Sequence, residues 1–112
     1  MKTILFIDES ESHRFFLQEE LSEAGYEVFT AKEIEEALSK WRDFNPDLII
    51  LELRQESLKK ETFQALKKQY PNIPWIGYST FVQCPEEYKQ WVNFYMQKSS
   101  EVNGLRNLIG SL

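Results

Sequence analysis

The sequence is poor in the residues that usually signal disulfides, linkers or membrane segments. A single cysteine, Cys84, excludes an internal disulfide, and four glycines with four prolines in 112 residues argue against a disordered or low-complexity chain. The longest apolar runs, at residues 4–7 and 48–51, are far too short to cross a bilayer, and no signal-peptide pattern is present. These absences predict one domain over residues 1–112, without a further domain or membrane contact, in the reducing cytoplasm.

Positive charge is also in short supply. The chain has 18 acidic against 13 basic side chains, for a net charge of -5 at pH 7. This balance argues against nucleic acid as a direct partner, because phosphate backbones require a basic surface. Residues 1–56 carry fourteen acidic and six basic side chains, whereas residues 57–112 carry four acidic and seven basic ones. Cation chemistry is therefore sought in the N-terminal half, although most of its acids are expected to be solvated.

The 42% of hydrophobic residues is enough for one packed core, and these residues are grouped in an alternating pattern. Short apolar runs predict strands at residues 3–7, 26–30, 47–53, 75–79 and 93–97. Apolar residues at helical spacing predict helices at residues 11–24, 31–44, 58–70, 85–91 and 102–112. This alternation predicts a parallel sheet covered on both faces by helices.

Local signals mark some of the predicted helix ends. Gly25 follows the first helix, where a left-handed C-terminal cap is favoured. Thr30 and Glu33 have the spacing of a capping box at the start of the second helix. Pro85 suits the first turn of the fourth helix.

Polar residues gather where the predicted strands end. Asp8 and Glu9 follow the first strand, Glu52 lies near the end of the third, Ser79 ends the fourth, and Lys98 follows the fifth. Ligands of doubly wound sheets bind at the carboxyl ends of strands, so three carboxylates converge there if the first and third strands are neighbours. Because like charges repel, such a cluster requires a bound cation such as Mg²⁺, the lysine ammonium or a protonated acid.

Five segments resemble the receiver domain of bacterial two-component response regulators. They are KTILFIDE at residues 2–9, ELSEAGYEV at 20–28, NPDLIILEL at 45–53, IPWIGYST at 73–80 and YMQK at 95–98. The resemblance covers the whole chain and implies a flavodoxin-like (βα)₅ α/β fold, in three layers with strand order 2-1-3-4-5. It also implies a stand-alone, CheY-like domain of phosphorelay signal transduction that is not an enzyme.

The resemblance further implies roles for individual residues. Asp8 and Glu9 fall on the acidic pair that holds Mg²⁺, and Glu52 falls on the aspartate that receives a phosphoryl group from a histidine kinase. The switch hydroxyl, the switch aromatic residue and the lysine that contacts the phosphoryl oxygens correspond to Ser79, Tyr95 and Lys98. In such domains the metal and the lysine neutralise charge while the carboxylate acts as nucleophile.

The acceptor site departs from the family pattern. Glu52 stands in place of aspartate, and its extra methylene moves the carboxylate outward by roughly 1.5 Å, enough to spoil a tightly positioned transfer. Glu9 is longer than the usual second aspartate in the same way. The methionine-proline pair that the family usually has in the loop after the acceptor is missing, and Arg54, Gln55 and Glu56 stand there instead. Arg54 is a candidate salt-bridge partner for the carboxylates. The stretch from Ser79 to Lys98 is shorter than usual, which shrinks the fourth helix.

These departures suggest a pseudo-receiver in which Glu52, paired with Lys98, partly imitates phosphoaspartate. It would act by contact with a protein partner, such as a histidine kinase, a phosphotransferase or an effector, and a homodimer is also open. A working Mg²⁺-dependent phosphoacceptor is the main alternative, and a structural ion cluster of Glu52, Arg54 and Lys98 is another. A flavodoxin-like cofactor enzyme is disfavoured, because no phosphate-binding loop follows the first strand.

Several surface features have no assigned role in this scheme. Phe15 and Phe16 adjoin Leu17 in the first helix, so at least one of these apolar side chains points away from the core. It is either a docking point or an isolated exposed residue. His13 is expected to be solvated. The lysines of the third helix form either a solvated face or a patch for an acidic partner.

Overall fold

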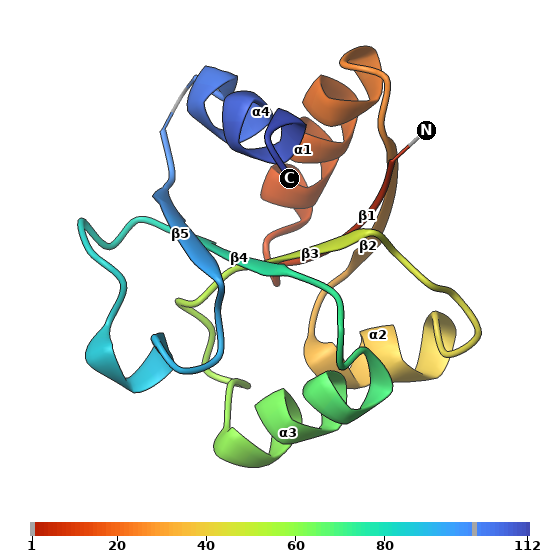
Figure 1. Ribbon diagram of the computed structural model, residues 1–112, viewed down its shortest axis with the longest axis vertical. Coiled ribbons are helices and arrows are strands. Elements are labelled where there is room, and N and C mark those ends of the chain that lie inside the picture. The colour runs from red at the N-terminus through yellow and green to blue at the C-terminus, as the bar shows by residue number, and fades with distance from the viewer. Residues whose placement is uncertain (1, 100) are drawn as a thin grey trace.

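Five parallel strands form a single sheet in the order β2-β1-β3-β4-β5 (Figure 1). The computed structural model describes residues 2–99 and 101–112. The strands are β1 Thr3–Ile7, β2 Glu27–Ala31, β3 Leu48–Leu51, β4 Trp75–Ser79 and β5 Phe94–Gln97. The predicted order and the flavodoxin-like fold class are therefore confirmed, and the strand bounds differ from the predicted ones by at most two residues.

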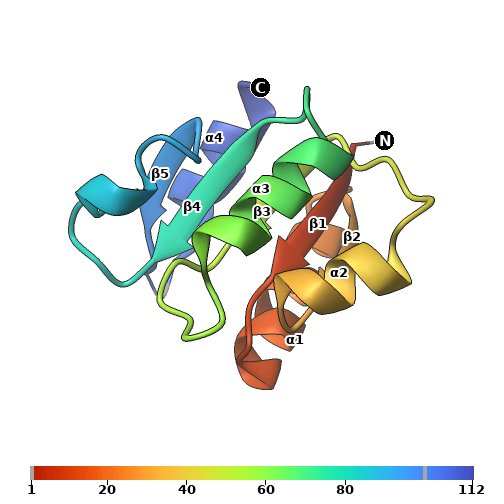
Figure 2. The same ribbon diagram turned by 90° about the horizontal axis from the view of Figure 1, so that it is seen from below.

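Helices cover both faces of the sheet. They are α1 Glu11–Glu23, α2 Ile34–Lys40, α3 Lys60–Gln69 and α4 Asn103–Gly110. Helices α1 and α4 lie on one face, and α2 and α3 lie on the other (Figures 1 and 2). In the described part of the chain, no helix is long and apolar enough to cross a membrane.

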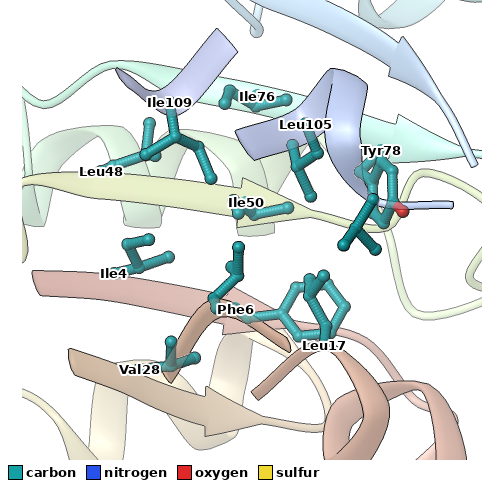
Figure 3. Close-up of a cluster of buried hydrophobic side chains, with 12 residues drawn as sticks. Ile4, Phe6, Leu17, Val28, Leu48, Ile50, Ile76, Tyr78, Leu105 and Ile109 are labelled. Atoms are coloured by element: carbon teal, nitrogen blue, oxygen red, sulfur yellow. The ribbon is translucent and has the colours of Figure 1, made fainter. Parts of the chain in front are cut away.

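Alternate residues of each central strand supply two separate cores. On β1, Ile4 and Phe6 face α1 and α4, whereas Leu5 and Ile7 face α2 and α3, because successive side chains of a strand point to opposite faces. Figure 3 shows the first core, where strand residues pack against helical leucines and isoleucines such as Leu17, Leu105 and Ile109. Burial on both faces explains why the central strands are continuous apolar runs.

The predicted capping box of the second helix is wrong. Thr30 and Ala31 belong to β2, where Ala31 pairs with Ile7 and its carbonyl accepts a hydrogen bond from the amide of Asp8. Residues that the local pattern predicted at a helix start therefore form sheet hydrogen bonds instead. Helix α2 begins only after Glu33, whose side chain makes no capping hydrogen bond. The predicted cap at Gly25 is confirmed by a positive φ of 95°.

The predicted fourth helix, at residues 85–91, is also wrong. Only one turn of 3₁₀ helix, η1 (Glu86–Tyr88), forms between β4 and β5. Tyr88 and Trp91 both pack against Phe63 of α3, with ring centroids 5.5 and 5.3 Å from it. Trp91 follows η1, and its amide donates to the carbonyl of Tyr88, so three-residue turns continue past η1 and place both rings against α3.

Candidate functional site

Two acidic residues lie side by side at the carboxyl ends of the two neighbouring strands β1 and β3. Asp8 directly follows β1 and Glu52 directly follows β3, and these strands pair with Ile7 opposite Leu51. Both acids are buried, with exposed fractions of 1% for Asp8 and 6% for Glu52. The predicted convergence of these carboxylates at the carboxyl edge of the sheet is therefore present.

Lys98 bridges the two carboxylates. Its Nζ lies 2.7 Å from Oδ2 of Asp8 and 2.7 Å from Oε1 of Glu52. The position of Lys98 follows from β5, whose pairing with β4 continues in a hydrogen bond from the Lys98 amide to the Ser79 carbonyl. A bound cation, a lysine ammonium or a protonated acid could relieve the repulsion between the two acids, and in this structure the ammonium of Lys98 does so. One ammonium still leaves the pair of carboxylates with a net negative charge.

The remaining carboxylate oxygens accept hydrogen bonds from the backbone. Oδ1 of Asp8 accepts from the amide of Ser10, the N-cap residue of α1, at 2.9 Å. Oε2 of Glu52 accepts from the amide of Arg54, also at 2.9 Å. Gln55 donates its side-chain amide to the Glu52 carbonyl, which holds the loop after β3 against the site. Both carboxylates are thus fixed at both oxygens.

These contacts set the ionisation of Glu52. Burial alone would raise its pKa, but the Lys98 ammonium, the neighbouring Ser79 hydroxyl and the Arg54 amide together outweigh burial and lower the pKa below its ordinary value. Glu52 is therefore a carboxylate at neutral pH. The buried Ser79 hydroxyl faces it without a hydrogen bond of ordinary geometry to any described residue.

Glu9 does not join the cluster. Its side chain is exposed, and within residues 2–99 and 101–112 no three His, Cys, Asp or Glu side chains are grouped to hold a metal. Lys98 lies between Asp8 and Glu52. The Mg²⁺ site of Asp8, Glu9 and Glu52 stays a prediction.

The predicted role of Arg54 as a partner of the carboxylates is wrong. Its guanidinium lies over the ring of Phe81, 4.3 Å from the centroid. Among described residues, its side chain forms no ion pair with Glu52, so a structural cluster of Glu52, Arg54 and Lys98 is not present. Cation–π packing on an aromatic ring satisfies the guanidinium outside the acidic site.

Tyr95 connects the site to the segment after β4. Its hydroxyl donates to the carbonyl of Phe81 and lies 3.2 Å from the carbonyl of Ser79. Gly77 makes room for the ring, because a Cβ at that position would lie 3.2 Å from Tyr95 and 2.8 Å from Leu53. The role of Gly77 was not predicted from the sequence, where its only signal is an isolated glycine within a strand pattern.

His13 is a second residue whose place at the site was not predicted. Its side chain is 55% exposed, as expected, but its Nδ1 also lies 3.0 Å from Nζ of Lys98 and 3.7 Å from Oδ2 of Asp8. In this geometry the ring accepts a hydrogen bond from the ammonium group. The available signal was its position in the first turn of α1, at the carboxyl end of β1.

A pocket of about 320 Å³ adjoins the cluster. Phe6, Leu17 and Tyr78 line its apolar part, and His13, Thr80 and Lys98 line its polar part. Phe16 stands at this pocket and is 45% exposed.

A parallel sheet of this order, with an acid after β1, an acid after β3 and a lysine after β5 at one edge, defines a receiver-type signalling domain. Residues 4–109 match the family described as response regulator receiver domain, and the chain belongs to that family. Receiver domains are signalling domains of two-component systems.

Solved structures show the same fold over nearly the whole chain. Response regulator TrrA from Thermotoga maritima, in complex with Mg²⁺ and BeF, is 29% identical with a TM-score of 0.82, covering 99% of this chain and 98% of TrrA. Chemotaxis protein CheY4 of Vibrio cholerae is 27% identical with a TM-score of 0.85 and the same coverage. TrrA in complex with histidine kinase ThkA is 29% identical, with a TM-score of 0.83, covering 99% of this chain and 97% of that one.

A curated relative is longer than this chain. The alkaline phosphatase synthesis transcriptional regulatory protein PhoP of Bacillus subtilis is 46% identical over 74 residues, which are 65% of this chain and 31% of that protein. The matched part thus spans about a third of the relative's length.

Proposed function

We propose that this receiver domain transmits signals through protein contacts without phosphorylation at Glu52. The observation that carries the proposal is the bridge from Lys98 to Asp8 and Glu52. It supports a site in which the position of the acceptor is filled by a carboxylate that is ionised at neutral pH and bonded at both oxygens.

Phosphoryl transfer to a carboxylate requires a free oxygen aligned with the donor phosphorus. Both oxygens of Glu52 are engaged, one by Lys98 and the other by the amide of Arg54. The side chain is also buried, so attack would first require these hydrogen bonds to break. The charge of Glu52 replaces only part of the nearly two charges of a phosphoryl group.

The rest of the site supports one persistent conformation. The hydrogen bond from Tyr95 to Phe81 ties the loop after β4 to β5. Arg54 stacks on the same Phe81 and ties this loop to the one after β3. Glu52 and these loops are therefore already connected by contacts that form without a phosphoryl group.

The proposed partner is a histidine kinase, a phosphotransferase or an effector protein. TrrA, which shares the fold and 29% of its residues, was solved bound to a histidine kinase. In this chain, the exposed Phe16 and the pocket beside His13 and Lys98 offer apolar and polar contacts next to the site.

Amide NMR spectra of the ¹⁵N-labelled chain, with and without Mg²⁺ and acetyl phosphate, test the proposal. We expect the amide signals of Glu52, Ser79 and Tyr95 to stay in place. Shifts of these signals that require both reagents and disappear in Glu52→Gln would overturn it and support the Mg²⁺-dependent phosphoacceptor. Glu56→Gln is the matched control, because Glu56 is exposed in the same loop.

A further inference from the structure

Helix α1 presents an exposed stripe of acids around one phenylalanine. Four residues spaced four apart, and therefore on one side of the helix, are all exposed: Glu11, Phe15, Glu19 and Glu23. Phe15 is 66% exposed and does not line the pocket at the candidate site, unlike Phe16. We call these four residues the α1 stripe.

Helix α3 borders a groove of the opposite character. A pocket of about 260 Å³ lies between the start of α3 and η1, with Leu58, Phe63, Tyr88 and Trp91 lining its apolar part. Phe63 and Trp91 stack with centroids 5.3 Å apart and planes 10° apart, which gives the groove a rigid aromatic wall. The short 3₁₀ turn in the crossover from β4 to β5 forms the other side of the groove.

We call this pocket the α3 groove. Two lysines border it where helix α3 begins. Lys59 and Lys60 are exposed, line the groove and stand at the N-terminal end of α3. Cations are unfavourable at that end of a helix, and no ion pair of either side chain occurs among the described residues. Glu87 lines the other side of the groove, so the excess positive charge there is carried by the α3 side.

We propose that the α1 stripe of one copy docks in the α3 groove of a second copy. Phe15 packs against the aromatic side chains that line the groove, and the acids beside it face Lys59 and Lys60 of the other copy. Such an arrangement pairs an exposed aromatic residue with the aromatic part of the groove and two cations with acids, which is the pattern of a specific interface.

The two surfaces lie on opposite faces of the sheet, because α1 and α3 do (Figure 1). One copy therefore offers both surfaces at once, and the contact is heterologous rather than two-fold symmetric. The expected assembly is a head-to-tail series of copies that lengthens with concentration, not a closed dimer.

Sedimentation velocity of the full chain over a concentration series tests this assembly. We expect the weight-average sedimentation coefficient to rise with concentration, and Phe15→Ser to weaken association by roughly tenfold or more. Lys59→Glu with Lys60→Glu, and separately Glu19→Lys with Glu23→Lys, should each abolish association. Mixing these two double variants should restore it, because the reversed stripe then meets the reversed groove and the unchanged surfaces meet each other.

Matched charge changes elsewhere provide the controls. Lys68→Glu and Glu35→Lys alter exposed residues outside both surfaces and should associate like the unmodified chain. Circular dichroism confirms that each variant is folded. An unmodified chain that stays monomeric at all concentrations overturns the proposal, as does a mixture of the double variants that fails to associate.

Discussion

Nζ of Lys98 lies 2.7 Å from Oε1 of Glu52, in a place where both groups are largely removed from water. The same Nζ lies 2.7 Å from Asp8, so one cation holds two buried anions together. Every other oxygen of these carboxylates accepts a backbone hydrogen bond. The site is therefore closed by its own side chains, and Lys98 is the group on which its charge balance depends.

Lys98→Met should destabilise the fold by about 3–5 kcal/mol, because it leaves two buried carboxylates without their cation. Urea denaturation followed by circular dichroism measures this loss. Lys89→Met is the control, because Lys89 makes an ion pair of the same 2.7 Å length with Glu86 at the exposed surface. It should change stability little, and equal effects of the two substitutions would contradict the role given to Lys98.

The lowered pKa of Glu52 predicts how stability depends on pH. Since the folded pKa lies below the ordinary value of 4.5, the stabilisation is fully present above about pH 4.5 and is lost as pH falls through the folded pKa. The free energy of unfolding of the unmodified chain should exceed that of Glu52→Gln most at neutral pH. Urea denaturation from pH 7 downward should show this difference shrinking in acid, and a difference that grows in acid would refute the assignment.

Tyr95→Phe should reduce the free energy of unfolding by about 0.5–1.5 kcal/mol, because it removes the hydrogen bond to the carbonyl of Phe81. Tyr88→Phe removes a hydroxyl from another half-buried tyrosine, which donates no hydrogen bond to a described residue. The same denaturation measurement should find Tyr88→Phe near neutral. A larger loss for Tyr88→Phe than for Tyr95→Phe would show that the tie between β5 and the loop after β4 is unimportant.

Gly77→Ala should destabilise the domain by about 1–3 kcal/mol through overpacking. The new Cβ would lie 2.8 Å from Cδ1 of the buried Leu53, which has little room to move. Gly104→Ala in α4 is the control, because its Cβ would meet Met96 at an ordinary 3.5 Å. That substitution should be neutral or stabilising, as alanine is favoured over glycine in a helix. Thermal unfolding of both variants distinguishes the two cases.

The sheet was predictable because buried parallel strands are short apolar runs, as at residues 4–7 and 48–51. The family resemblance implied the strand order, and from that order the proximity of Asp8, Glu52 and Lys98 follows, because each lies at the carboxyl end of its strand. The position of His13 near the carboxyl end of β1 was open to prediction, but its contact with Lys98 was not, because that contact depends on the conformations of two side chains from α1 and from the end of β5.

Errors arose where tertiary contacts override local patterns. Charge alone makes Arg54 a candidate salt-bridge partner of the carboxylates, but its guanidinium packs on Phe81, a residue distant in sequence. The capping spacing at Thr30 was overridden by pairing in the sheet, and the helix at residues 85–91 by packing of Tyr88 and Trp91 on α3. In each case a local sequence preference is overridden by contacts that form only in the folded chain.

The most direct test of the account is the intact mass of the unmodified chain after incubation with acetyl phosphate and Mg²⁺, measured beside Glu52→Asp. The substituted side chain is one methylene shorter and should withdraw from Lys98, which frees a carboxylate oxygen for attack. We predict that the unmodified chain keeps its mass and that the variant gains one phosphoryl group. A phosphoryl group gained by the unmodified chain, and absent from Glu52→Gln, would contradict the central claim.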